Sequence, residues 1–303
     1  MASSQTGPWR SFLFAPANHA RRAEKAFQAG ADAAILDLED AVAVAEKPGA
    51  RAGAVAALER PRLCKGFVRV NAAETEWCFG DMEAVVGPWL DGIVLPKLES
   101  AATLQTIDWT LAQLERKAGL EIGTIDLMPL IETGRGVSNL KDIVSCRSRL
   151  RRLCFGAGDY TLDVGMRWSL DEVDLSHARA ALVVESRAGG LEPPIDTVFI
   201  ELRETEAFAA SACCARGLGF QGKLCIHPSQ VGPVNDAFSP TEQEMEHARR
   251  IVMAFEEAEA AGSASIQVDG YFVDYPIVEK ARRTLALAYR IAARGHIEGP
   301  AVT

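Results

Sequence analysis

The stretch "ADAAILDLEDAV" (31–42) decides the fold, because it joins an apolar strand to a cluster of acids. The run 33–40 is typical of a strand that is buried on both faces, as in a parallel sheet. Asp37, Glu39 and Asp40 lie near its carboxyl end, where unpaired carboxylates are costly to bury. Side-chain alternation places Asp37 and Glu39 on one face and Asp40 on the other, so the three acids are not expected to bind one ion.

Seven further apolar runs predict strands, with helical stretches between them. Alternation of this kind indicates parallel strands covered by helices. Eight units between residues 11 and 228 fit an α/β fold of the (β/α)8 TIM-barrel type better than the alternative, an open doubly wound sheet. The other predicted strands are "SFLFAP" (11–16), "GFVRVN" (66–71), "GIVLPK" (92–97), "IDLMPLIET" (125–133), "RLCFGAGD" (152–159), "IDTVFI" (195–200) and "KLCIHP" (223–228).

The pattern changes after residue 239. A long helical segment, a turn-rich piece containing "VDGYFVDYP" (268–276) and a last helical segment follow. We therefore predict a catalytic barrel over residues 1–239 and a C-terminal helical extension over 240–303. Gly30, Gly119 and Gly189 are predicted to end helices within the barrel.

Composition excludes several classes of protein. The formal net charge is −9 and no basic stripe occurs, which argues against a nucleic-acid partner. The seven cysteines are odd in number and contain no C-x-x-C, as expected for a reduced, cytoplasmic protein. The first residues lack the apolar core of a signal peptide and no run is long enough to span a membrane, so no membrane association is expected.

Polar residues follow the predicted strands, and in a barrel these ends meet on one rim. Several carboxylates there would repel one another unless a cation compensates. Carboxylates without paired histidines indicate Mg²⁺, with Mn²⁺ possible. Glu132 and Asp159 are the predicted direct ligands, since each comes singly from a strand end beside glycine. The alternative for Asp40 and Asp159 is capping of the helices that follow.

Three other strand-end residues have competing interpretations. Arg69 either pairs with neighbouring acids or holds a substrate carboxylate. Lys97 is compatible with a Schiff base, although the acids favour metal chemistry instead. His227 is interpreted as a turn residue. The G-x-G of "FGAGD" (155–159) lacks the third glycine of a dinucleotide site, so its glycines are interpreted as allowing close approach of a small ligand.

The ordered set of motifs resembles the citrate lyase β-subunit-like family, relatives of malyl-CoA and citramalyl-CoA lyases in the HpcH/HpaI aldolase and citrate lyase superfamily. One departure is Ala17, where many members have glycine. The likeness covers nearly the whole chain through "RSFLFAPAN" (10–18), "GADAAILDLEDAV" (30–42), "EKPGAR" (46–51), "VRVN" (68–71), "LPK" (95–97), "IET" (131–133), "FGAGDYTLDVG" (155–165), "SRAGGLEPPID" (186–196), "GKLCIHPSQV" (222–231) and "DGYFVDYPIVEKARR" (269–283).

The resemblance implies roles for particular residues. It places magnesium on Glu132 and Asp159, the acid end of the substrate on Arg69, and Glu39 and Asp40 around the water shell of the metal. It also implies a homotrimer or hexamer whose C-terminal segment closes over a neighbouring subunit's site, with Asp274 as a catalytic acid. Helix capping explains Asp274 poorly if Pro276 is the first helical residue.

The expected activity is cleavage of a citryl-, malyl- or citramalyl-CoA-like thioester into acetyl-CoA, or a homologue, and a 2-keto acid. Two alternatives stay open, a thioesterase acting on malyl-CoA-like substrates and a 2-keto acid aldolase that does not use CoA. An acyl-carrier protein in place of CoA is possible but not indicated. Further substrate contacts are expected from Thr133, Gly134 and Lys97, and contacts to the CoA phosphates from Arg21, Arg22 and Lys25.

Overall fold

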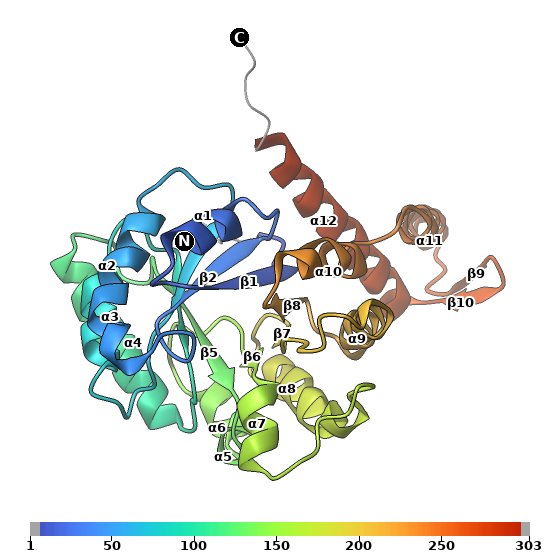
Figure 1. Ribbon diagram of the computed structural model, residues 1–303. Coiled ribbons are helices and arrows are strands. Elements are labelled where there is room, and N and C mark those ends of the chain that lie inside the picture. Colours follow the sequence, from blue (N-terminus) through green and yellow to red (C-terminus); the bar gives the residue numbers. More distant parts are fainter. Residues whose placement is uncertain (1–6, 298–303) are drawn as a thin grey trace. The chain divides into compact units, whose positions relative to one another are not determined.

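The computed structural model describes residues 7–297, with side chains described to residue 293. Eight parallel strands close into one barrel in chain order, and helices surround it (Figure 1). The predicted TIM barrel is therefore confirmed. The strands are β1 (Ser11–Pro16), β2 (Ala33–Asp37), β3 (Lys65–Arg69), β4 (Gly92–Leu95), β5 (Asp126–Ile131), β6 (Cys154–Phe155), β7 (Ile195–Asp196) and β8 (Gly222–Cys225).

Alternate residues of the strands form two apolar layers. Inward-facing side chains fill the barrel, and Phe12, Phe67 and Trp9 pack together there with ring centroids 5.6–6.0 Å apart. Outward-facing residues such as Leu36 and Ile93 pack beneath the helices. Because the barrel is filled by side chains, any site must lie above this plug, at the strand ends.

The helices of the barrel begin and end at expected residue types. Ser100 caps α4, since its hydroxyl accepts a hydrogen bond from the Thr103 N–H. Gly30 and Gly119 have positive φ just after helices, and Gly189 is the C-cap residue of α8 (Ser176–Ala188), so all three end helices as predicted. The helices are α1 (Ala20–Phe27), α2 (Lys47–Leu58), α3 (Cys78–Val85), α4 (Ala101–Lys117), α5 (Gly134–Ser138), α6 (Leu140–Ser145), α7 (Ala157–Asp163), α8 (Ser176–Ala188), α9 (Thr205–Leu218) and α10 (Val231–Ala237).

A second compact unit begins at Ser239, and the barrel unit comprises Trp9–Phe238. In the second unit α11 (Glu242–Ala260) and α12 (Tyr275–Ile297) pack around Phe255, and β9 (Ile266–Val268) pairs antiparallel with β10 (Tyr271–Val273). Asp269 and Gly270 join these strands, and both have positive φ, as the two central residues of a type I′ turn require. Neither these helices nor any other described helix is long and apolar enough to cross a membrane.

A buried ion network ties the last two barrel strands to the helix layer. Asp196 on β7 accepts hydrogen bonds from Lys223 Nζ at 2.6 Å and from Arg179 Nε at 2.8 Å. Burial opposes ionisation of Asp196, but these two cations hold its pKa below the usual value of 3.8. The carboxylate is therefore charged, and it compensates the fully buried ammonium of Lys223.

We predict that Asp196→Asn lowers the free energy of unfolding by about 3–5 kcal/mol, because it leaves the Lys223 charge buried without its counterion. Urea denaturation at pH 7 measures the loss. The matched control is Glu83→Gln, which removes the exposed partner of Lys117 and should cost no more than about 1 kcal/mol. Because the folded pKa of Asp196 is lowered, the advantage of the wild type is complete above pH 3.8 and shrinks as the pH falls further. Equal losses in the two variants would contradict the role of the network.

Candidate active site

A cavity of about 540 Å³ opens at the carboxyl ends of the strands. One part of its wall is apolar and includes Phe14, Leu130 and Leu224, which top the barrel plug. The other part is charged and contains five of the predicted site residues, Arg22, Asp40, Arg69, Glu132 and Asp159. The polar and glycine residues of the lining are Arg22, Asp37, Asp40, Arg69, Glu132, Gly156, Gly158, Asp159 and Thr197.

A bidentate ion pair lies at the inner end of this cavity. Asp37 and Arg69 occupy paired positions on β2 and β3, and Arg69 Nε and Nη2 donate to the two Asp37 oxygens at 2.8 and 2.6 Å. Burial opposes ionisation of Asp37, yet the guanidinium and two backbone N–H groups keep its pKa lowered. The ring of Phe14 lies 5.0 Å from the guanidinium carbon. The orientation of Arg69 is therefore fixed on two sides.

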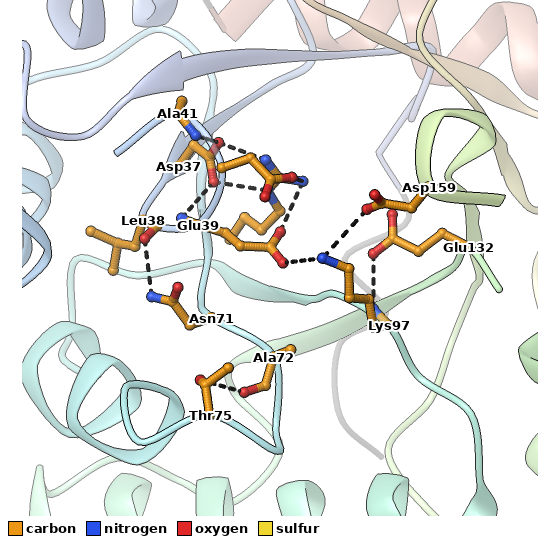
Figure 2. Close-up of polar contacts among 12 residues, drawn as sticks. Asp37, Leu38, Glu39, Ala41, Asn71, Ala72, Thr75, Lys97, Glu132 and Asp159 are labelled. Atoms are coloured by element: carbon orange, nitrogen blue, oxygen red, sulfur yellow. Dashed lines mark hydrogen bonds and ion pairs between the residues drawn. The ribbon is translucent and has the colours of Figure 1, made fainter. Parts of the chain in front are cut away.

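The strand β2 ends at Asp37, three residues earlier than predicted. Its carboxylate accepts hydrogen bonds from the N–H groups of Glu39 and Ala41 at 2.9 and 3.1 Å, which turns the chain (Figure 2). The expectation that alternation separates Glu39 from Asp40 is consequently wrong. Both acids approach the same nitrogen, Arg69 Nη1, at 3.0 and 3.5 Å.

The turn after β2 is held by Lys47, a residue to which the sequence assigned no role. Its side chain is buried, and Nζ donates to the carbonyl oxygens of Leu38 and Glu39 and to Asn71 Oδ1 at 2.6–2.9 Å. Asn71 in turn donates to the Leu38 carbonyl oxygen and to Asp81. Lys47 belongs to the quoted motif "EKPGAR", so a lysine directly before a helix proline was the available signal.

Glu132 and Asp159 lie across Lys97 from Glu39 (Figure 2). Glu132 follows β5 and is buried, whereas Asp159 lies in the first turn of α7 and is 30% exposed. Gly156 precedes α7 and is the helix N-cap residue, so capping does not explain Asp159. An added Cβ at Gly156 would lie 2.3 Å from Glu132 Oε2 and 2.6 Å from Glu132 Cβ. Glycine is therefore required at position 156 for Glu132 and Asp159 to lie close together.

Lys97 lies between the two groups of acids (Figure 2). Its backbone N–H donates to Glu132 Oε1 at 2.9 Å, while Nζ lies 3.1 Å from Glu39 Oε1 and 3.5 Å from Asp159 Oδ2. Partial burial opposes the charge, but Glu39 and Asp159 raise the pKa of the ammonium. The charged amine is not suited to form a Schiff base, which needs the neutral form.

The chemistry of these acids fits a divalent metal. Burial raises the pKa of Glu132 to about 8, and the charges of Glu39 and Asp159 add to this rise, so the site carries excess negative charge that a cation would offset. Among the described residues, no group of three or more acidic, histidine or cysteine side chains is arranged to hold a metal ion. Magnesium is commonly held by one or two carboxylates, with water and substrate completing its shell. Glu132 and Asp159 satisfy this smaller requirement.

Two predicted substrate contacts already have partners within the chain. Thr133 caps α5, because its Oγ1 accepts a hydrogen bond from the Gly136 N–H at 3.0 Å. The Gly134 N–H donates to Asp163 Oδ2 at 2.7 Å. A substrate carboxylate bound to this N–H would have to displace Asp163.

The three basic residues of α1 extend the cavity outward. Arg22 lines the main cavity, and Arg21, Arg22 and Lys25 together line a shallow depression of about 610 Å³ that shares Arg22 with it. All three side chains are exposed. The site acids are therefore joined to a basic surface through a continuous run of lining residues.

Two predictions concern residues outside this cluster. His227 is a turn residue, as interpreted, and its ring caps a short helical turn by accepting from the Ser229 N–H. Asp274 lies in the C-terminal unit directly before α12, because that helix begins at Tyr275 and not at Pro276. The spacing argument against capping by Asp274 is therefore wrong, since the helix begins one residue earlier than proline preference alone suggested.

Comparisons with known proteins agree with the motif resemblance. The model of the family described as HpcH/HpaI aldolase/citrate lyase matches residues 10–228. Citrate lyase subunit beta of Leuconostoc mesenteroides subsp. cremoris is 35% identical over 281 residues, which cover 92% of this chain and 93% of that protein. A (3S)-malyl-CoA thioesterase of Cereibacter sphaeroides is 36% identical over 291 residues, covering 95% and 98%.

A solved structure extends the likeness to three dimensions. It is CitE from Mycobacterium tuberculosis in complex with magnesium, acetoacetate and coenzyme A. Its sequence is 30% identical to this chain, the TM-score is 0.75, and the match covers 94% of this chain and 99% of that one.

Two neighbouring glycines provide a test of how the site is built. We predict that Gly156→Ala lowers the free energy of unfolding by about 1–3 kcal/mol, because its Cβ would overlap the Glu132 side chain. Gly158→Ala is the control, since Gly158 lies within α7 and its added Cβ would meet only the Trp168 ring, at 4.0 Å. That variant should be neutral or more stable by up to about 1 kcal/mol. Thermal or urea unfolding distinguishes the two, and equal stabilities would contradict the packing described for Glu132.

Proposed function

This chain belongs to the HpcH/HpaI aldolase/citrate lyase family, and on that premise we propose that it is a magnesium-dependent carbon–carbon lyase. Its substrate is a 3-hydroxyacyl thioester of coenzyme A bearing a carboxylate, of the citryl-, malyl- or citramalyl-CoA kind. The products are acetyl-CoA, or a homologue, and a 2-keto acid. The observation that carries the proposal is the convergence of Glu132, Asp159 and Arg69 on one cavity at the barrel rim.

Glu132 and Asp159 would hold the metal. When bound, magnesium supplies Lewis-acid polarisation of the substrate hydroxyl and carboxylate oxygens. The carboxylates of Glu132 and Asp159 are available as ligands without rearrangement of β5 or α7, because Gly156 already allows the close approach of Glu132. Manganese has the same preference for oxygen ligands and is proposed as a substitute.

Arg69 adds positive charge where negative charge develops on the substrate oxygens. Asp37 and Phe14 fix the guanidinium before substrate arrives, so little reorganisation accompanies the reaction. Glu39 is the proposed acid of the barrel unit for proton transfer, since it lies 3.0 Å from Arg69 Nη1 and burial raises its pKa. The apolar wall formed by Leu130 and Leu224 limits the access of water to the reacting carbons.

Coenzyme A would extend from the cavity over α1. The exposed cations Arg21, Arg22 and Lys25 provide local positive charge for its phosphates on a chain whose net charge is −9. The relative solved with coenzyme A supports this ligand class. A thioester of an acyl-carrier protein would present a similar phosphopantetheine arm. The two carriers therefore differ only in the part of the molecule to which this arm is attached.

Hydrolysis of the thioester is the second candidate. It is favoured by the malyl-CoA thioesterase relative, which matches 95% of the chain at 36% identity, against 35% for citrate lyase subunit beta. The two reactions differ in their products. Hydrolysis releases free CoA and an intact hydroxy acid, whereas lysis releases acetyl-CoA, or a homologue, and a 2-keto acid.

We predict that purified protein with Mg²⁺ cleaves at least one of malyl-, citramalyl- and citryl-CoA to acetyl-CoA and a 2-keto acid. Chromatography of the CoA species together with a keto-acid assay identifies the products. Glu132→Ala and removal of metal by EDTA should each lower kcat/KM by at least about a hundredfold, while Mg²⁺ restores only the chelated wild type. Free CoA as the sole thioester product would favour hydrolysis. No turnover of the panel by protein shown to bind Mg²⁺ would refute both reactions.

We further propose that the C-terminal unit completes the site of a neighbouring subunit in a trimer or hexamer, with Asp274 transferring a proton. Partly exposed Asp274 is flanked by the exposed aromatic residues Phe272 and Tyr275, a surface suited to contact another chain.

Subunit mixing tests the shared site. Glu132→Ala and Asp274→Ala should each be inactive alone, and mixtures unfolded and refolded together should regain part of the wild-type activity, because some sites receive both intact residues. For random trimers in which each site has one donor and one neighbour, the regained fraction approaches about a quarter at equal concentrations. Light scattering gives the oligomeric state. Assembled mixtures without regained activity would place Asp274 in its own subunit's site, and activity of Asp274→Ala alone would place it outside the reaction.

A further inference from the structure

Lys97 has an unusual backbone for its residue type. It follows β4 with a φ of +52°, in the left-handed region that side chains other than glycine and asparagine seldom adopt. Strain of this kind persists where the surrounding structure imposes it, and it is concentrated at functional sites. The conformation directs the Lys97 N–H toward Glu132 while its side chain reaches Glu39.

Lys97 connects acids from three separate elements, because its ammonium contacts Glu39 and Asp159 while its backbone N–H donates to Glu132. Glu39 lies in the turn after β2, Glu132 follows β5, and Asp159 is on α7. Within the described chain, Lys97 is the basic residue paired with Asp159, at 3.5 Å, and the same ammonium lies 3.1 Å from Glu39 (Figure 2). Its side chain is 36% exposed, so it can move without a large packing cost.

We propose that Lys97 is a positioning residue that competes with the divalent cation for Asp159 and thereby sets the metal affinity of the site. This inference rests on the metal site of the proposed function. The oxygen that Lys97 approaches, Asp159 Oδ2, belongs to a carboxylate that would ligate the metal. One carboxylate cannot fully neutralise an ammonium and a nearby divalent ion together, so each cation weakens the binding of the other.

The competition has a structural purpose that follows from the charges. Without a cation among them, the negative charges of Glu39, Glu132 and Asp159 would repel one another. The ammonium partly offsets the negative charges of Glu39 and Asp159, which it contacts, and its flexible stem allows it to move toward Glu39 when Asp159 changes partner. Lys97 is thus assigned to the carboxylates and not to the substrate.

Metal titrations of Lys97→Met test the proposal. Methionine keeps the length of the stem and the backbone N–H but removes the charge, so the variant should bind Mg²⁺ about tenfold more tightly than the wild type. Calorimetry with Mg²⁺, or Mn²⁺ binding followed by electron paramagnetic resonance, measures the affinity without substrate. In the absence of metal the variant should unfold at a lower temperature, and saturating Mg²⁺ should raise its midpoint more than that of the wild type.

Two control variants isolate the local charge. Lys97→Arg keeps the charge and should bind metal with nearly wild-type affinity, and Lys117→Met removes a surface ammonium paired with Glu83 and should change nothing. Unchanged or weaker Mg²⁺ binding by Lys97→Met, with normal binding by the wild type, would overturn the role of Lys97 alone. Absence of binding by both proteins would refute the metal site of the proposed function together with this inference.

Discussion

The ion pair between Asp37 and Arg69 is the constraint on which the site depends. It lies directly above the apolar plug of the barrel, where neither charge could remain without the other. Asp37 performs two tasks, since it fixes the guanidinium with both oxygens and ends β2 by accepting two backbone N–H groups. The position of the reactive cation and the shape of the acid-bearing turn therefore have a common cause.

The remaining charges are arranged around this pair so that acids outnumber bases. Arg69 and Lys97 each contact more than one carboxylate, and Glu132 is left with an elevated pKa because burial and its acidic neighbours outweigh the cations nearby. An imbalance of this kind is unfavourable for folding alone. It is favourable for a site whose full complement includes a divalent cation.

Much of the fold could be predicted because parallel buried strands leave a strong pattern of apolar runs between helices. The eight runs each overlap a strand, and the acids Glu132 and Asp159 were found because strand ends converge in such barrels. The sequence pattern could not predict the hydrogen bonds that side chains make with the backbone. Asp37 shortens β2 and brings Glu39 and Asp40 together, and Lys47 holds the turn from a helix start. The start of α12 was missed by one residue for a related reason, since proline permits more than one position in the first turn.

The barrel is not equally strong around its circumference. β1 and β2 pair along Phe12–Pro16 and Ala33–Asp37, whereas β6 and β7 pair only at Cys154 and Ile195. Glu132 follows a six-residue strand, while Asp159 stands on a short helix behind the two-residue β6. A divalent ion held by both residues would link the well-paired side of the barrel to its weakly paired side.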